Sequence, residues 1–229
     1  MGVATDAHDF LSSLKPQDLD VLNALAGART FRRGQVLFHK GQLSDRVLVL
    51  RTGMVKVTST TSNGREVVLA FRGPGELVGE LSAFDDEPRS ATIRAVEEVE
   101  ALTLSPQAFR DFVLARPAVA LVLLQMLGRR LRDADAKRIE LSTYTTIERV
   151  AVRLLEFGDR FGRQDESGAL RITLPISQEE LAGAAGASIE SVGRALNTMR
   201  GLRCIETRRR EITLVDPQVL ASLCADASA

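Results

Sequence analysis

The sequence predicts an α+β fold in which an all-β region, one long helix and a group of shorter helices follow one another. Short alternating segments separated by glycines fill residues 30–105, which is typical of a closed barrel or jelly roll. A long helical pattern starts at Pro117, and two shorter ones flank Gly186. The expected domains are an N-terminal β barrel, a long helix with a hinge, and a C-terminal helical domain, at residues 1–116, 117–144 and 145–229 respectively.

The β region contains several strand-like segments in which apolar and polar residues alternate. Asn63-Gly64 lies between two of these segments and is a strong signal for a tight hairpin turn. Residues 8–27 are expected to form short helices that pack against the barrel. With 45% apolar residues, the 229-residue chain can bury substantial cores.

The long helix carries a heptad seam, because apolar positions recur at alternating spacings of three and four residues. An exposed seam of this kind needs a partner, and a parallel homodimer supplies one. The alternative is that the helix packs against the chain's own barrel through apolar residues on its other face. Residues 142–146 break the pattern and are expected to form a hinge, and Thr145 or Thr146 can cap the next helix. The seam consists of Leu124, Leu127, Leu131, Ala134, Leu141 and one misfit, Arg138.

Residues 176–202 have the layout of a helix-turn-helix. Ser177 can cap a helix that starts at Gln178, and Glu180 completes a capping box. Gly186 is placed to end that helix with a positive φ, and Ser188 can cap the second helix. The buried stripe of the second helix is predicted to contain Val192, Leu196 and Met199.

The first turns of that second helix present Ile189, Glu190, Ser191 and Arg194 outward. A recognition helix reads bases in the major groove with its N-terminal residues. Arginine can bond both acceptors of guanine, and glutamate can accept from the cytosine amine. The alternative is an ordinary pair of helices in an all-α core.

A basic hairpin is expected to follow the recognition helix. Residues 205–207 and 212–215 alternate like strands around a turn, which predicts a winged helix-turn-helix. The chain as a whole is neutral, but residues 188–210 hold six Arg and two Glu, a net charge of +4. Local positive charge is what phosphate binding requires, although a solvated turn of arginines is the alternative. The predicted wing tip contains Arg208, Arg209 and Arg210 as phosphate contacts. Ser188, at the start of the recognition helix, is a further candidate DNA-binding residue.

Several classes of protein are disfavoured by composition. No apolar run is long enough to span a bilayer and no signal peptide is visible, so we expect a cytoplasmic protein without a membrane partner. The only cysteines, Cys204 and Cys224, form no C-x-x-C pair, and the only histidines are His8 and His39. The sequence therefore holds few of the His and Cys side chains that nucleophilic triads and catalytic metal sites use, and we do not expect an enzyme.

A polar cassette interrupts the β region at residues 79–82 (G-E-L-S) and 88–91 (P-R-S-A). A short helix opening at Gly79 would offer free N–H groups to an anion, Arg89 can clamp a phosphate and Ser90 adds a donor. Glu80 is an acceptor that suits a ribose hydroxyl. This combination describes a nucleotide pocket, and the alternative is a Glu80–Arg89 ion pair that braces a loop. The candidate pocket residues in this region are Gly79, Glu80, Leu81, Ser82, Arg89 and Ser90.

Three motifs in this order resemble the superfamily of bacterial transcription factors that contains the cyclic-AMP receptor protein and the fumarate–nitrate regulator (CRP/FNR). They are the cassette, Q-M-x-x-R-R-L at residues 125–131 and S-x-E-S-V-G-R-x-L at residues 188–196. The resemblance covers roughly residues 10–220. It implies a cyclic-nucleotide-binding-type jelly-roll barrel, a coiled-coil homodimer and a winged helix-turn-helix. It also implies that Gly79, Glu80, Arg89 and Ser90 hold the ribose and cyclic phosphate, and that Glu190, Ser191 and Arg194 read DNA.

The sequence departs from the cyclic-AMP receptors at the base end of the pocket. Their dimer helix supplies a Thr-Ser or Thr-Asn pair to the adenine, whereas the matching positions here hold Ala134 and Asp135. Asp135 could accept from the adenine amine, take the paired donors of a guanine edge, or pair with Lys137 or Arg138 and bind nothing. Cyclic AMP or cyclic GMP is the leading effector, bound without a covalent link. A different ligand, or none, is the alternative, whereas iron–sulfur and haem sensing are disfavoured because cysteines and histidines are so few.

The second departure is Ile189, where the cyclic-AMP receptors place an arginine that reads an outer guanine. An aliphatic residue resembles the fumarate–nitrate branch and can touch a thymine methyl. We therefore expect an inverted repeat with a half-site that resembles TGA.

The sequence thus predicts a homodimeric, sequence-specific transcriptional regulator of double-stranded DNA. A ligand in the barrel would press on the dimer helix near Ala134 and Asp135, and the hinge near Tyr144 would pass the change to the recognition helices. RNA polymerase is a partner if the protein activates transcription, although no contact surface for it can be located. The alternatives are the same regulator without a nucleotide effector and a cyclic-nucleotide-binding module that acts on a protein partner.

Overall fold

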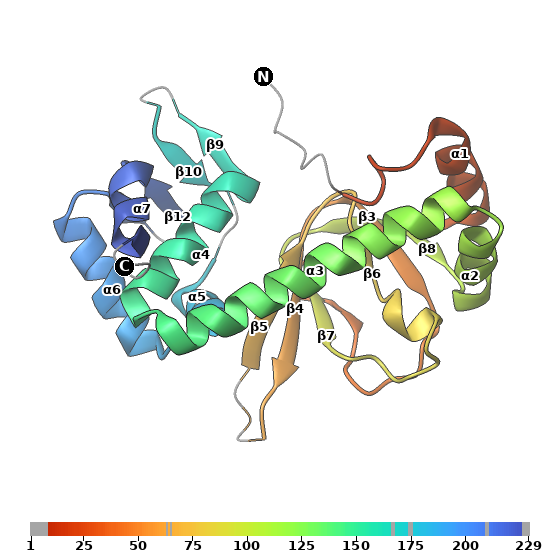
Figure 1. Ribbon diagram of the computed structural model, residues 1–229, viewed down its shortest axis with the longest axis horizontal. Coiled ribbons are helices and arrows are strands. Elements are labelled where there is room, and N and C mark those ends of the chain that lie inside the picture. Colours follow the sequence, from red (N-terminus) through yellow and green to blue (C-terminus); the bar gives the residue numbers. More distant parts are fainter. Residues whose placement is uncertain are drawn as a thin grey trace. The chain divides into compact units, whose positions relative to one another are not determined.

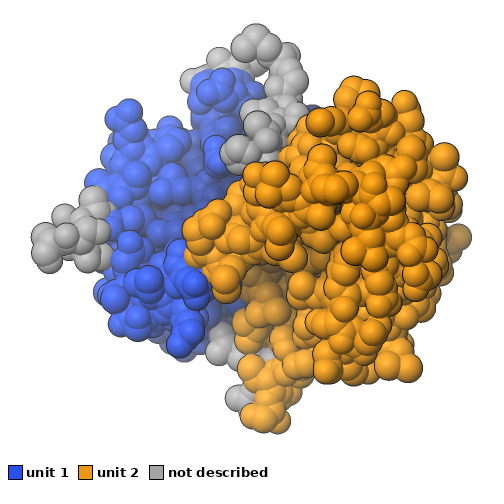
Figure 2. Space-filling model, turned by 45° about the vertical axis from the view of Figure 1, so that its right-hand side comes forward, with its two compact units in different colours: residues 1–4, 133–229 blue, residues 5–132 orange. Residues whose placement is uncertain are grey.

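The computed structural model describes residues 9–62, 64, 66–165, 168–173, 176–208 and 211–225. These residues form two compact units, which we call the N-terminal unit and the C-terminal unit (Figure 2). The boundary between the units lies inside the long helix α3 (Pro117–Thr143), between Arg132 and Asp133. The three-part division at residues 116 and 144 is a division by function and stays a prediction.

The N-terminal unit is built on two four-stranded antiparallel sheets. This agrees with the predicted barrel or jelly roll. The first sheet has the order β1 (Gly27–Phe31), β8 (Val99–Leu104), β3 (Val47–Thr52) and β6 (Leu77–Val78). The second has the order β2 (Val36–Phe38), β7 (Thr92–Ala95), β4 (Val55–Thr60) and β5 (Glu66–Arg72).

Strand β3 explains why the unit has two cores. Its first four residues, Val-Leu-Val-Leu, are all apolar and buried, as expected of a strand that is buried on both faces. Leu48 and Leu50 belong to the core shared with the second sheet. Val47 and Val49 belong to a second core on the other face, where helices cover the sheet. These helices are α1 (Pro16–Leu25), α2 (Pro106–Leu114) and the first part of α3 (Figure 1).

Helix α3 has one buried face and one exposed face within the N-terminal unit. Leu123 and Met126 pack into the second core, whereas Leu124 and Leu131 of the predicted seam are 66% and 64% exposed. Leu141, near the end of the helix, is also exposed. Leu127, also part of the predicted seam, packs against the second core. The face toward the barrel therefore agrees with the alternative interpretation, and the exposed leucines remain available to a partner helix.

The C-terminal unit contains α4 (Thr146–Phe161), α5 (Gln178–Ala185), α6 (Ile189–Gly201) and α7 (Pro217–Ala225). A four-stranded antiparallel sheet accompanies them, in the order β11 (Ile205–Arg208), β12 (Glu211–Leu214), β10 (Leu170–Ile172) and β9 (Gly162–Gln164). The β11–β12 hairpin is the predicted wing. The β9–β10 pair was not predicted, because its three-residue strands are too short to show an alternating pattern.

The caps of the helix-turn-helix form as the sequence predicts. Ser177 Oγ accepts from the backbone N–H of Glu180, whose carboxylate accepts from the N–H of Ser177 at 2.9 Å. Gly186 ends α5 with φ 60° and ψ 38°, and Ser188 Oγ accepts from the N–H of Ser191. The predicted stripe of α6 (Val192, Leu196 and Met199) is buried.

The junction between α3 and α4 is braced by two arginines inside the C-terminal unit. Arg149 donates to the carbonyl of Tyr144 at 2.6 Å and to that of Ala185 at 2.8 Å. Arg153 is only 2% exposed and forms ion pairs with Glu140 and Glu156. Burial raises the pKa of Glu156 even though the Arg153 charge opposes this shift. The end of α3 is therefore fixed to α4 by charge as well as by chain connection.

Candidate functional site

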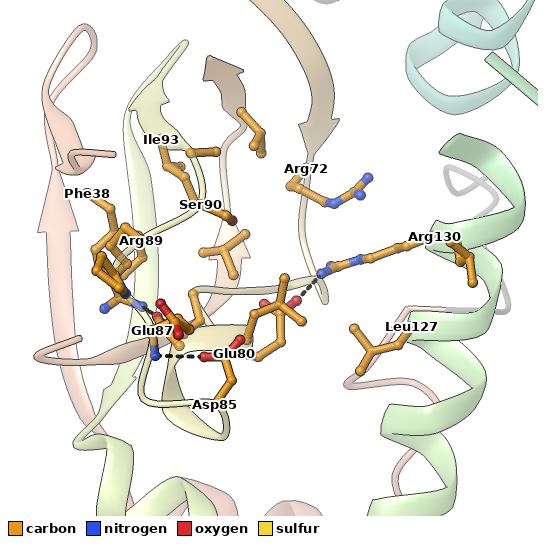
Figure 3. A pocket seen from close by; sticks show the side chains of 18 residues that line it. Phe38, Arg72, Glu80, Asp85, Glu87, Arg89, Ser90, Ile93, Leu127 and Arg130 are labelled. Atoms are coloured by element: carbon orange, nitrogen blue, oxygen red, sulfur yellow. Dashed lines mark hydrogen bonds and ion pairs between the residues drawn. The ribbon is translucent and has the colours of Figure 1, made fainter. Parts of the chain in front are cut away.

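A cavity of about 500 Å³ lies in the N-terminal unit, between the cassette, the second sheet and α3 (Figure 3). Its walls are mostly apolar, and most of its polar side chains lie in the loop from Gly79 to Ala91, which contains the cassette. All six of the predicted cassette residues line it, and so do residues of α3. They are joined by Phe38, Val57, Arg72, Val78, Asp85, Glu87, Pro88, Ala91, Ile93, Leu127, Arg130 and Leu131.

Gly79 is required by both backbone angle and space. Its φ is 79°, a value that residues other than glycine rarely adopt. A Cβ at this position would lie 2.7 Å from Arg89 Nη1 and 2.9 Å from Phe38 Cε2. The helix expected to open here is a single 3₁₀ turn, η1 (Leu81–Ala83), so the dipole of a longer helix contributes little to anion binding.

Arg89 is 4% exposed and is held by oxygens of the surrounding loops. Its Nη1 donates to the Gly79 carbonyl and to Ser82 Oγ, both at 2.7 Å, and its Nη2 donates to the Arg46 carbonyl at 2.5 Å. The guanidinium also stacks on Phe38, with 3.9 Å between its carbon and the ring centroid.

The charge of Arg89 is only partly compensated. Burial lowers its pKa, while the Asp45 carboxylate at 3.4 Å and the Glu80 carboxylate raise it. Within the described residues, Arg89 Nε is buried without a hydrogen-bond partner. The site therefore has capacity for one more acceptor, which fits an anionic ligand.

Glu80 is 5% exposed and pairs with α3 rather than with Arg89. Arg130 Nη1 donates to Glu80 Oε1 at 2.7 Å, and Arg130 Nη2 donates to the Leu77 carbonyl at 2.7 Å. The alternative interpretation of the cassette, a direct Glu80–Arg89 ion pair, is thus wrong. Arg130 is a site residue that sequence reasoning missed, although its spacing of four from the buried Met126 places it on the helix face toward the barrel.

The remaining predicted pocket residues divide into two groups. Ser82 is buried against Arg89, while Leu81 and Ser90 are exposed at the cavity. Ala134 and Asp135 are exposed residues of α3 that belong to the C-terminal unit and do not line the cavity. Their predicted contact with a base stays a prediction.

The N-terminal half of α6 presents a compact polar surface. Ile189, Glu190 and Arg194 are exposed and Ser191 is half-buried, and all four lie opposite the buried stripe. Arg194 forms an ion pair with Glu190 and donates to Ser191 Oγ at 2.9 Å. These contacts hold the guanidinium beside the first turn of the helix, where a recognition helix meets bases.

The wing lies next in the chain and adds basic residues. Arg208 is exposed and lies opposite Glu211 in the register of the β11–β12 hairpin. Arg209 and Arg210 lie outside the described residues. Arg200, at the end of α6, donates to Thr207 Oγ1 of β11 at 3.0 Å and so links the helix to the wing.

The described residues also bear on metal binding and on membrane insertion. Across the described ranges, no group of three or more His, Cys, Asp or Glu side chains is arranged to hold a metal ion. No single described helix is long and apolar enough to cross a membrane. Helices α2 and α3, which meet at an angle of 111°, reach the required length and apolar composition only when they are taken together.

Comparison with known proteins covers both units. Residues 28–116 match the family described as "Cyclic nucleotide-binding domain", and residues 148–223 match "Crp-like helix-turn-helix domain". The "CRP-like cAMP-activated global transcriptional regulator" of Mycobacterium tuberculosis is 36% identical over 212 residues, which is 93% of this chain and 94% of that protein. The "Cyclic AMP receptor protein" of Thermus thermophilus is 35% identical over 81% of this chain and 82% of its own length.

Solved structures agree on the fold. FixK2 from Bradyrhizobium japonicum superimposes with a TM-score of 0.77, at 24% identity, over 86% of this chain and 96% of its own. The barrel, long helix and winged helix-turn-helix of this chain agree with the sequence matches. The chain therefore belongs to the CRP/FNR superfamily of DNA-binding transcriptional regulators, as the family matches and the similar sequences show.

Proposed function

We propose that this regulator is a homodimer that binds a cyclic nucleotide in the cavity of its N-terminal unit and an inverted-repeat DNA site with its C-terminal units. The observation that carries the proposal is the pair of buried, oppositely charged groups at one end of the cavity. Arg89 offers donors for a cyclic phosphate, and Glu80 offers an acceptor for a ribose hydroxyl.

In this proposal, the phosphate takes the remaining donor capacity of Arg89, Nε, and competes with the carbonyls that Arg89 now holds. Ser90 adds a hydroxyl from the exposed rim of the same loop. The ribose hydroxyl competes with Arg130 for Glu80. Because Arg130 belongs to α3, the ligand changes a bond between the cassette and the dimer helix, which is how occupancy would bias a two-state helix.

For DNA, we propose that Arg194 reads a guanine, Glu190 accepts from a cytosine amine and Ile189 meets a thymine methyl. Ser188 and Ser191 lie at the start of the same helix, and Arg208 with its neighbours in the wing contacts phosphates. Two such helices in a dimer read two half-sites of the TGA type. The exposed seam residues Leu124, Leu131 and Leu141 support the dimer.

The rest of the proposal follows from this role. The protein acts in the cytoplasm without catalysis of its own, and RNA polymerase is its partner where it activates transcription.

A second candidate is the same regulator without a nucleotide effector. A specific observation favours it: in the free protein, Glu80 is satisfied by Arg130, and the terminal nitrogens of Arg89 are satisfied by loop oxygens. A cassette whose charged groups are satisfied in this way, with only Arg89 Nε unpaired among the described residues, needs no ligand for stability. A module that acts only on a protein partner is less favoured, because it would have no use for the exposed Glu190 and Arg194.

Calorimetric titration of the full-length dimer with cyclic AMP and cyclic GMP tests the proposal. We expect micromolar binding of at least one nucleotide, weakened in Ser90→Ala, which removes a donor from the exposed rim of the cavity. The matched control is Ser222→Ala in α7, which we expect to bind as the wild type does. Absence of binding by both nucleotides would favour the effector-free regulator.

A further inference from the structure

The walls of the cavity that β5 and α3 supply carry hydrogen-bond donors and no acceptor side chain. All of the carboxylates that line the cavity (Glu80, Asp85 and Glu87) lie in the loop from Gly79 to Ala91. Outside that loop, the described lining residues with a polar side chain are Arg72 and Arg130, and a guanidinium has no acceptor. The other lining residues there are apolar, and they include Val57, Ile93 and Leu127. A planar base enclosed by these apolar walls would meet guanidinium groups at its edge.

Of the two arginines, Arg72 is the one placed to read a ligand. Arg130 is committed to Glu80 and to the Leu77 carbonyl, both at 2.7 Å. Arg72 ends β5, and Figure 3 shows its side chain directed toward the part of the cavity near Arg130, away from Arg89. It has local contacts with Glu76 at 3.4 Å and with the Phe71 carbonyl at 3.1 Å. Both contacts are local to the end of β5, and a ligand acceptor adds to them or replaces one.

We propose that Arg72 sets the base preference of the pocket and selects a guanine over an adenine nucleotide. This inference rests on the proposed function, namely that the cavity binds a cyclic nucleotide. Guanine presents two neighbouring acceptors, O6 and N7, which match the paired donors of one guanidinium. Adenine keeps N7 but carries an amine at the neighbouring position, so one donor of Arg72 would face another donor.

The size of the preference follows from the chemistry of the pair. A bidentate Arg–guanine contact discriminates against the wrong base by about tenfold or more. Cyclic GMP is therefore expected to bind at least about tenfold more tightly than cyclic AMP. Cyclic IMP, which keeps O6 and N7 but lacks the 2-amine, is expected to bind like cyclic GMP.

The test is calorimetric titration of the full-length dimer with all three nucleotides. Arg72→Met keeps much of the side-chain length and removes the donors, so it should weaken cyclic GMP and cyclic IMP by about tenfold and bring the three affinities to within about threefold. Arg72→Lys keeps the charge with one point donor and should lie between. Glu76→Gln changes a residue that contacts Arg72 but does not line the cavity, so this variant should keep the wild-type order of the three nucleotide affinities.

The outcomes separate this inference from the proposed function. A wild-type preference for cyclic AMP, or a base preference that survives Arg72→Met and Arg72→Lys, would overturn the role of Arg72 alone. Cyclic GMP that binds far better than cyclic IMP would also overturn it, because the reading would then lie at the 2-amine edge. If none of the three nucleotides binds the wild type, the proposed function fails and the inference falls with it.

Discussion

Replacement of Arg89 should destabilise the N-terminal unit of the free protein as well as abolish nucleotide binding. Arg89→Ala removes a buried cation and leaves the Gly79 carbonyl, Ser82 Oγ and the Arg46 carbonyl without their donors. It also removes the stacking contact with Phe38. The variant is therefore not a clean control for ligand binding.

The cost can be bounded from these contacts. A hydrogen bond to a charged group is worth about 1.5–3 kcal/mol, so a simple sum over the three short bonds would exceed about 4 kcal/mol. Burial of the charge offsets part of that gain, as the lowered pKa of Arg89 indicates, and water can enter the open cavity and satisfy the orphaned oxygens. We expect a loss of about 3 kcal/mol in the free energy of unfolding, which for a unit of this size is roughly a 12 °C fall in Tm.

Scanning calorimetry of the full chain is the assay, because the C-terminal unit serves as an internal reference for the N-terminal one. Arg110→Ala is the matched control, since Arg110 is partly exposed and pairs with the exposed Asp86, and its loss should cost less than about 1 kcal/mol. An Arg89→Ala protein that melts like the Arg110→Ala control would refute the network around Arg89 in the free protein.

Three further predictions concern the C-terminal unit. Because the pKa of Glu156 is raised above the ordinary 4.5, the folded protein binds this proton more readily than the unfolded chain, and Glu156 lowers stability as pH rises through the interval between the two pKa values. In urea titrations from about pH 4 to 7, Glu156→Gln should lose this fall in the free energy of unfolding. A variant whose stability changes with pH as the wild type's does would contradict the prediction. Gly186→Ala should cost about 1–2 kcal/mol in calorimetry because the residue has φ 60°, with the crowding by Leu141 Cδ2 relieved by a side-chain shift; a variant as stable as the wild type would disprove the strained turn. In DNA titrations, Arg194→Ala should lose about 1–3 kcal/mol and relax specificity at one guanine, whereas Arg208→Ala should weaken all sequences alike and reduce the salt slope by about one; identical behaviour of the two variants would mean that the groove assignment is wrong.

Local rules were sufficient where one residue determines a backbone feature. Ser177, Glu180, Gly186 and Ser188 could be assigned from the sequence because caps depend on neighbours three or four residues away. The alternating strands and the apolar stripe of α6 were predictable for the same reason. The cassette could be located as well, because its polar residues interrupt an apolar region.

What could not be predicted depends on contacts between segments distant in the chain. The Glu80–Arg130 pair joins residues fifty positions apart, and the seam pattern drew attention to the other face of α3. The contribution of Arg72 to the cavity required the pairing of β5 with β4, since a terminal strand arginine usually faces solvent. The buried Arg153 was missed because its carboxylate partners lie on two different helices.

The most direct test of the central claim is a fluorescence anisotropy titration of the full-length protein on a labelled inverted repeat of TGA-type half-sites, with and without cyclic nucleotide. The account predicts binding to the repeat that a scrambled duplex of equal length does not reproduce at the same salt concentration, and that the nucleotide strengthens. Equal affinity for the two duplexes, unchanged by nucleotide, would contradict a ligand-controlled regulator that reads sequence.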